Sequence, residues 1–237
     1  MKKLSLPILE LSNICRSSRK ADIERLELTV PTGESFAVLH SSPEAVSLLL
    51  DILEGRVSPK KGKVFFKGDD IIGTKNNFGI VRGRDAPPKK KVIELAAAPI
   101  IKRGLSRSPT DVLVRKEAAA FGLADIAEES AAKLPPEKAA EAVIFGAYMC
   151  SHELMVIDEP SFRLEDDALR SKLFDRLIEL KNEHNVSLLV FTQDVDTAVR
   201  LADYVMVVDD KFSSKGIIAI DKRKIELSRK KIIELTE

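Results

Sequence analysis

The sequence has few cysteines and histidines, and it has no long apolar run. Its two cysteines, Cys15 and Cys150, provide neither a disulfide framework nor a metal-binding motif, and its three histidines are scattered without ligand spacing. No apolar stretch approaches the roughly 18–20 residues that span a bilayer. Pro7 and Glu10 interrupt the first apolar stretch too early for a secretory signal. We therefore expect a chain without disulfides, without a transmembrane segment of its own and without a secretory signal.

The sequence also has no excess of charge of either sign. The 38 Lys and Arg residues stand against 37 Asp and Glu residues, so the formal net charge is +1. This balance argues against a strongly basic nucleic-acid binder and against an acidic tail protein. With 237 residues, of which 44% are hydrophobic and 32% charged, the composition is typical of a soluble globular protein. It predicts one α/β domain with room for an inserted subdomain.

Strand-like and helix-like segments alternate along the chain. Short apolar runs predict strands at 26–30, 35–39, 63–66, 79–81, 154–157, 187–191 and 204–208. Helical spacing of apolar residues, or richness in alanine, predicts helices at 44–53, 92–101, 111–121, 137–150, 169–180 and 196–202. The β-α-β-α-β order of the last third predicts a parallel sheet with helices on both faces.

In such sheets, ligands bind at the carboxyl ends of the strands, and two positions qualify here. One is the turn after Leu39, and the other is the pair Asp158-Glu159, which follows an uninterrupted apolar strand. The first carboxylate can hold Mg²⁺ directly or through water, and the second can orient or deprotonate an attacking water. A charged turn after a buried strand, with no chemistry attached, is the alternative.

Several segments resemble the ATP-binding cassette (ABC) family, in the family's order and over nearly the whole chain. Residues 154–161 (LMVIDEPS) are similar to its Walker B strand. Residues 187–194 (SLLVFTQD) are similar to its switch strand, with Gln193 where the family has histidine. The resemblance implies an α/β fold: a P-loop NTPase-like (RecA-like) sheet with helices on both faces, an antiparallel β portion and an inserted α-helical subdomain. Residues 1–237 are then one ABC ATPase-like domain, with 1–84 and 150–237 as its core and 85–149 as the helical subdomain.

The resemblance also implies a cofactor and a set of roles. Mg-ATP is the family's cofactor. Ser47 and Asp158 match the positions that bind the magnesium ion, and Glu159 matches the catalytic base. Gln193 occupies the switch position in a degenerate form, because it can still form hydrogen bonds but carries no charge.

The counterpart of the phosphate loop runs from His40 to Leu48 (HSSPEAVSL) and departs from the family's pattern. All three glycines are replaced, Val46 stands in place of the lysine, and Ser47 alone matches. Such a loop wraps phosphates with backbone N–H groups, which requires glycine conformations, and Pro43 removes one N–H. The family's signature motif aligns with 134–138 (LPPEK), in which the leucine alone survives. We therefore expect ATP binding and hydrolysis to be weak or lost.

Three functions are consistent with these observations. The favoured one is a degenerate ATP-binding subunit of an ABC transporter, peripheral on the cytoplasmic face of the membrane. It would work with a membrane permease and with a second ABC subunit. That second subunit would be either an identical chain or a different one, such as an intact cassette. No nucleic-acid partner is expected. The alternative is a non-catalytic pseudo-ATPase scaffold or regulatory protein that retains the fold. The third is a true nucleotide enzyme with an altered loop.

Overall fold

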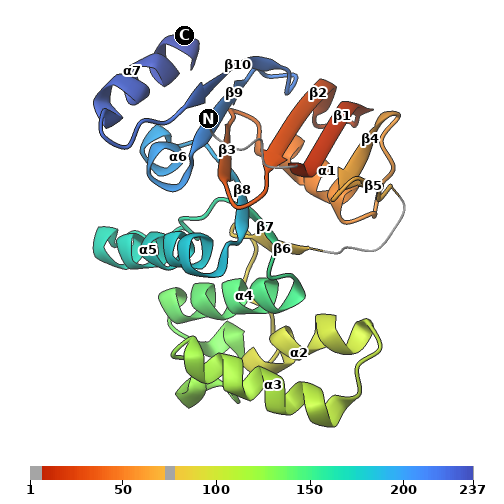
Figure 1. Cartoon of the computed structure of the whole chain (residues 1–237), viewed down its shortest axis with the longest axis vertical. Coiled ribbons are helices and arrows are strands. Elements are labelled where there is room, and N and C mark those ends of the chain that lie inside the picture. Colours follow the sequence, from red (N-terminus) through yellow and green to blue (C-terminus); the bar gives the residue numbers. More distant parts are fainter. Residues whose placement is uncertain (1–6, 73–77, 237) are drawn as a thin grey trace.

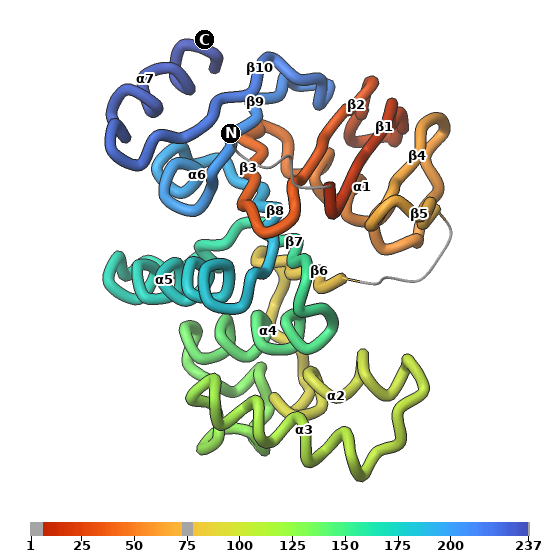
Figure 2. The backbone as a smooth tube through the Cα atoms, in the orientation of Figure 1, coloured from red at the N-terminus to blue at the C-terminus, as the bar shows by residue number. Residues whose placement is uncertain are grey.

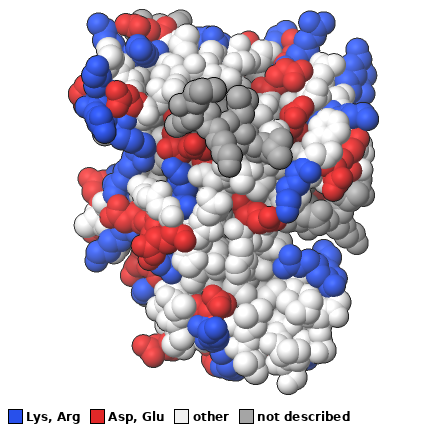
Figure 3. Space-filling view, viewed as in Figure 1, with Lys and Arg blue, Asp and Glu red and all other residues white. Residues whose placement is uncertain are grey.

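The computed structural model describes residues 7–72 and 78–236. Within these ranges the chain forms two β-sheets together with several helices (Figure 1). No helix in the described ranges combines the length and the apolar character that crossing a bilayer requires. On the face drawn in Figure 3, acidic and basic side chains are interspersed, mainly in the upper half and along the left edge, and much of the lower half is uncharged.

The larger sheet contains, in the described residues, six strands. Their spatial order is β10 (Ser214–Ala219), β9 (Tyr204–Val208), β3 (Ser35–Leu39), β8 (Ser187–Thr192), β7 (Leu154–Asp158) and β6 (Gly79–Arg82). The strands from β9 to β6 pair in parallel, and β10 is antiparallel to β9. Every residue of β3, β7 and β8 is buried, as expected of parallel strands covered on both faces. The predicted parallel sheet is confirmed.

The smaller sheet is antiparallel. Its spatial order is β2 (Asp22–Pro31), β1 (Pro7–Ser17), β4 (Lys61–Phe66) and β5 (Asp69–Asp70). The sequence predicted strands inside β2 and β4 but not β1. The reason lies at Asn13, where a bulge with a positive φ of 50° interrupts the pairing between Leu11 and Ile14 and hides the alternation of buried residues.

Helices cover both faces of the larger sheet. They are α1 (Pro43–Leu53), α2 (Val92–Lys102), α3 (Arg107–Ala120), α4 (Pro136–Cys150), α5 (Asp167–His184), α6 (Val195–Leu201) and α7 (Ile225–Thr236), with short 3₁₀ turns at Ala124–Ile126 and Ala131–Lys133. The sequence predicted that the third helix begins at residue 111, whereas α3 begins at Arg107. Pro109 lies in the first turn of α3. Backbone N–H groups in a first helical turn have no acceptor within the helix, so proline, which has no N–H, is tolerated there.

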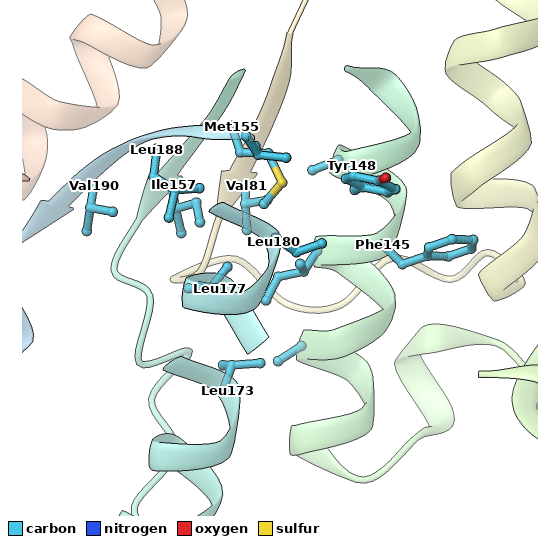
Figure 4. Packing of buried hydrophobic residues seen from close by; sticks show 14 of the residues in the cluster. Val81, Phe145, Tyr148, Met155, Ile157, Leu173, Leu177, Leu180, Leu188 and Val190 are labelled. Atoms are coloured by element: carbon cyan, nitrogen blue, oxygen red, sulfur yellow. The ribbon is translucent and has the colours of Figure 1, made fainter. Parts of the chain in front are cut away.

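Alternate residues of the central strands face two different hydrophobic clusters. Met155 and Ile157 of β7 pack with α4 and α5 on one face of the sheet, as Figure 4 shows. Leu154 and Val156 pack with α1 and the smaller sheet on the other face. This alternation follows from the two-residue period of a strand. It places the central strands, and therefore their ends, between the two hydrophobic clusters.

Helices α2, α3 and α4 form one end of the molecule (Figure 1). The chain enters this end after β6 and returns to the sheet through α4 and β7, a path that Figure 2 traces. The rings of Phe121, Phe145 and Tyr148 pack together there, with centroids 4.9 Å and 5.1 Å from that of Phe121. The helical end is therefore packed against the sheet through α4.

Candidate functional site

The candidate site lies where four parallel strands end side by side. In the sheet, β3 neighbours β8, β8 neighbours β7 and β7 neighbours β6. Leu39 is paired with Thr192, and Asp158 is paired with both Phe191 and Arg82. The residues that follow these four strands are thus brought to one edge, which is where parallel sheets place their ligands.

The turn after β3 is short, because only His40, Ser41 and Ser42 separate it from α1. Helix α1 begins at Pro43, which lies inside the segment that aligns with the phosphate loop. The hydroxyl of Ser42 accepts a 3.2 Å hydrogen bond from the backbone N–H of Ala45. This cap occupies the backbone N–H of Ala45, a donor at the helix start that would otherwise be available to a phosphate.

His40 is buried beneath this turn. His40 is 5% exposed, and its ring centroid lies 6.1 Å from that of Phe212. Neither ring nitrogen has a hydrogen-bond partner among the described residues. Burial, and secondly the positive charge of Arg84, lower the pKa of His40 from 6.5 to about 4. The imidazole is therefore neutral at pH 7.

The side chains of Val46 and Ser47 lie on different sides of α1. Val46 is fully buried among the residues that pack against the smaller sheet, whereas Ser47 is exposed. Val46 belongs to the buried face of α1, which also includes Ala45, Leu49 and Leu50, and Ser47 lies outside that face. The position that aligns with the family's lysine is thus an interior position of this fold.

Arg84 is the residue at this edge that the sequence did not single out. Its Nε lies 3.4 Å from Asp158 Oδ1, and its Nη2 lies 3.3 Å from Glu159 Oε2. The same Nη2 lies 3.3 Å from Gln193 Oε1. The available signal was a pair of arginines that flank a glycine, the first ending β6 and the second in the loop that follows it. Nothing in the sequence periodicity shows, however, that the second of them turns back over β7.

The two carboxylates differ in their surroundings. Asp158 is 3% exposed, and burial raises the pKa of its carboxyl, an effect that Arg84 opposes. Glu159 is less buried, and its Oε1 accepts a 2.9 Å hydrogen bond from Ser161 Oγ. The backbone of Glu159 has a φ of 52°, a left-handed conformation that costs energy in a residue with a side chain. At this edge, both carboxylate oxygens of Glu159 and the Oδ1 of Asp158 thus already have partners.

Gln193 connects the carboxylates to the turn after β3. Its Nε2 donates a 3.3 Å hydrogen bond to the carbonyl of Ser41, while its Oε1 accepts from Arg84. The two positions proposed from the sequence, the turn after Leu39 and the pair Asp158-Glu159, are therefore joined through Gln193 and Arg84.

A groove of about 490 Å³ lies beside this edge. Leu134 and Pro136, at the start of α4, line it together with Gly83 and Phe162. Pro135 is the N-cap of α4 and forms no side-chain capping hydrogen bond. The segment that aligns with the family's signature motif thus presents proline rings and a leucine at a helix start.

Comparisons with known proteins give a consistent result. No protein-family model matches the sequence. The chain is 29% identical over 210 residues to the taurine import ATP-binding protein TauB of Pseudomonas aeruginosa, which covers 88% of this chain and 80% of that protein. It is 30% identical over 190 residues to a putative ABC transporter ATP-binding protein of Methanopyrus kandleri, covering 77% of this chain and 70% of that protein.

Solved structures with the same fold are also known. CbiO1 from Clostridium perfringens, part of the ABC transporter complex cbiONQ, superposes with a TM-score of 0.76 and 18% sequence identity. The match covers 96% of this chain and 93% of that one. This likeness confirms the predicted fold class: an α/β, P-loop NTPase-like arrangement with helices on both faces of the sheet and an antiparallel β portion.

Proposed function

Because the chain belongs to the family of ABC transporter ATP-binding proteins, we propose that it is a cassette subunit in which ATP binding and hydrolysis are weak or lost. It works with a membrane permease, at the cytoplasmic face of the membrane, and with a second cassette subunit. The observation that carries the proposal is the turn after β3, which is short, contains no glycine and is closed by the Ser42 cap.

The energetic argument starts from what a phosphate loop does. It surrounds the phosphates with backbone N–H groups and adds a lysine at the β- and γ-phosphates. Here Pro43 has no N–H, and Val46 is buried with no charge to offer. Losing even three charge-assisted hydrogen bonds of ~1.5–3 kcal/mol each weakens binding by roughly 10³–10⁶-fold. A micromolar site thereby becomes millimolar or weaker.

The residues proposed to hold magnesium do not fit Mg-ATP either. Magnesium requires near-octahedral oxygen ligands. The Asp158 carboxylate faces the Arg84 guanidinium, and Ser47 lies exposed on α1. Glu159, proposed as the base, and Gln193, proposed as the degenerate switch residue, have the same arginine as a partner. We derive no catalytic step through a nucleotide at this site.

The surface that a cassette offers to its partner's nucleotide is altered as well. In the aligned signature segment, Pro135 and Pro136 remove two backbone donors from the helix start. Glu137 adds a negative charge in the first turn of α4, where a helix N-terminus would otherwise favour phosphate. Both the turn that aligns with the phosphate loop and the segment that aligns with the signature motif therefore depart from the family's pattern. This favours, as a second candidate, a pseudo-ATPase scaffold or regulatory protein over one half of an asymmetric ATPase pair.

We further propose that the chain divides as the family does. Residues 1–84 and 150–237 form the core with its antiparallel β portion, and residues 85–149 form the helical subdomain. The packing of α2 against both α3 and α4, and of α4 against the edge strand β6, supports this division.

Titration calorimetry with Mg-ATP on the purified chain tests the loss of nucleotide binding. We expect no saturable binding tighter than ~0.1 mM and no phosphate release above that of buffer. Firm binding, or steady turnover by the chain alone, overturns this part of the proposal. Affinity purification from native membranes tests the other part: a co-purifying polytopic membrane protein with a second cassette supports the transporter subunit. A soluble partner without a permease supports the scaffold.

A further inference from the structure

Arg84 joins three side chains that come from the ends of neighbouring strands. Its guanidinium lies 3.3–3.4 Å from oxygens of Asp158, Glu159 and Gln193. The side chains of the two acids are 4% and 15% exposed, and that of Arg84 is 25% exposed. Two adjacent carboxylates with so little water around them repel each other, and a nearby cation relieves that repulsion. A guanidinium does this well because its donors are arranged in a planar fork.

The contacts continue beyond the three oxygens. Glu159 also accepts from Ser161 Oγ at 2.9 Å, and Gln193 donates to the carbonyl of Ser41 at 3.3 Å. One continuous hydrogen-bonded set therefore runs from the loop after β6, across the ends of β7 and β8, to the turn after β3. Arg84 is the member of this set that touches both acids and the glutamine.

We propose that Arg84 is a built-in cation that closes this site to divalent metal ions. A metal ion bound by the Asp158 carboxylate would lie close to the guanidinium that now faces its Oδ1, and the positive charge already present would repel it. The proposal rests on the proposed loss of nucleotide binding, and it explains how the strand ends are held together in a chain that takes up no Mg-ATP. Arg84 thus holds the ends of β7 and β8 together, a role that would otherwise fall to a bound metal ion.

The neighbouring arginine has a different role. The Nη2 of Arg82 lies 2.7 Å from both Asp51 and Glu54, so this guanidinium is committed to the end of α1. Arg56 reaches the same two acids from the surface, with a side chain that is 62% exposed. Removing Arg56 therefore deletes one arginine from an ion-pair network without touching Asp158. Arg56→Gln is the matched control for Arg84→Gln.

The test measures Mn²⁺ binding, without nucleotide, from the electron paramagnetic resonance signal of the free ion. Wild type, Asp158→Asn and Arg56→Gln are expected to show no saturable site up to about 10 mM Mn²⁺. Arg84→Gln is expected to gain one site at least about tenfold tighter, because its carboxylates lose their cation. The double variant Arg84→Gln, Asp158→Asn is expected to lose that site. Mn²⁺ is also expected to raise the urea midpoint of Arg84→Gln and not that of wild type.

Two results overturn the proposal. One is equal Mn²⁺ binding by Arg84→Gln and wild type. The other is a saturable site in wild type that Asp158→Asn removes, and this result contradicts the proposal even if Arg84→Gln fails to fold. Because no nucleotide is present, these results are separate from those of the Mg-ATP titration. Firm Mg-ATP binding by wild type defeats the proposed function, whereas unchanged Mn²⁺ binding in Arg84→Gln defeats the role of Arg84 alone.

Discussion

The backbone N–H of Gly83 donates a 2.7 Å hydrogen bond to the carbonyl oxygen of Asp158. A Cβ at position 83 would lie 2.2 Å from the carbonyl oxygen of Glu159 and 2.7 Å from that of Asp158. The loop after β6 therefore runs directly against the end of β7, and only glycine permits the approach. This close contact brings the next residue, Arg84, within reach of both carboxylates.

Gly83→Ala is expected to destabilise the protein by about 2–4 kcal/mol, because the added methyl meets backbone atoms that cannot move aside independently. Gly216→Ala is the matched control. A Cβ there meets only the tip of the Leu235 side chain, at 3.0 Å, and the expected loss is under about 1 kcal/mol. Urea unfolding of both variants measures the difference. Equal losses would show that the loop after β6 does not need to lie against β7.

The central strands could be predicted from the sequence because burial on both faces makes them continuous apolar runs. This holds for β3, β7 and β8, and the acids at the end of β7 could be located in the same way. Two features could not be predicted. The bulge at Asn13 interrupts the alternation in β1, and the contacts of Arg84 depend on a backbone approach at Gly83 that leaves no periodic trace. Charged residues in a loop have the same sequence pattern whether they face solvent or turn inward.

Val46→Lys is expected not to restore nucleotide binding and to destabilise the fold by about 3–5 kcal/mol, because it buries an unpaired ammonium group. Val46, a residue of α1, is fully buried in the cluster that α1 forms with the smaller sheet. The neighbouring variant Ser47→Lys adds the same charge at an exposed position of the same helix and is expected to change stability by less than about 0.5 kcal/mol. Unfolding curves and Mg-ATP titrations of both variants provide the check. Recovery of binding in Val46→Lys would contradict the assignment of this position to the core.

Ser42→Ala is expected to cost about 1 kcal/mol, because the N–H of Ala45 loses the acceptor that closes the start of α1. Ser106→Ala is its control: Ser106 is the N-cap of α3, but its side chain makes no capping hydrogen bond. We expect a change of only a few tenths of a kcal/mol there. If the two variants unfold at the same urea concentration, the turn after β3 is not closed by its serine.

His40 is expected to make the stability of the protein depend on pH in the acidic range. Its folded-state pKa of about 4 lies below the ordinary histidine value of 6.5 because the ring is buried and because Arg84 is nearby. Between these two values the unfolded chain binds a proton that the folded chain rejects. The free energy of unfolding therefore falls as the pH is lowered from about 6.5 toward 4, and this contribution levels off below that.

A shift of this size corresponds to roughly 3 kcal/mol between the two ends of the range. His40→Phe removes the titrating ring and keeps an apolar one beside Phe212, so the loss of stability from pH 6.5 to 4 is expected to shrink by that amount. Phe66→Leu, which alters a buried ring that does not titrate and packs against Phe78, is expected to retain the slope of wild type. Urea unfolding at half-unit pH steps compares the three proteins. If His40→Phe retains the slope, other groups carry the acid sensitivity and the buried imidazole under the turn after β3 is not its source.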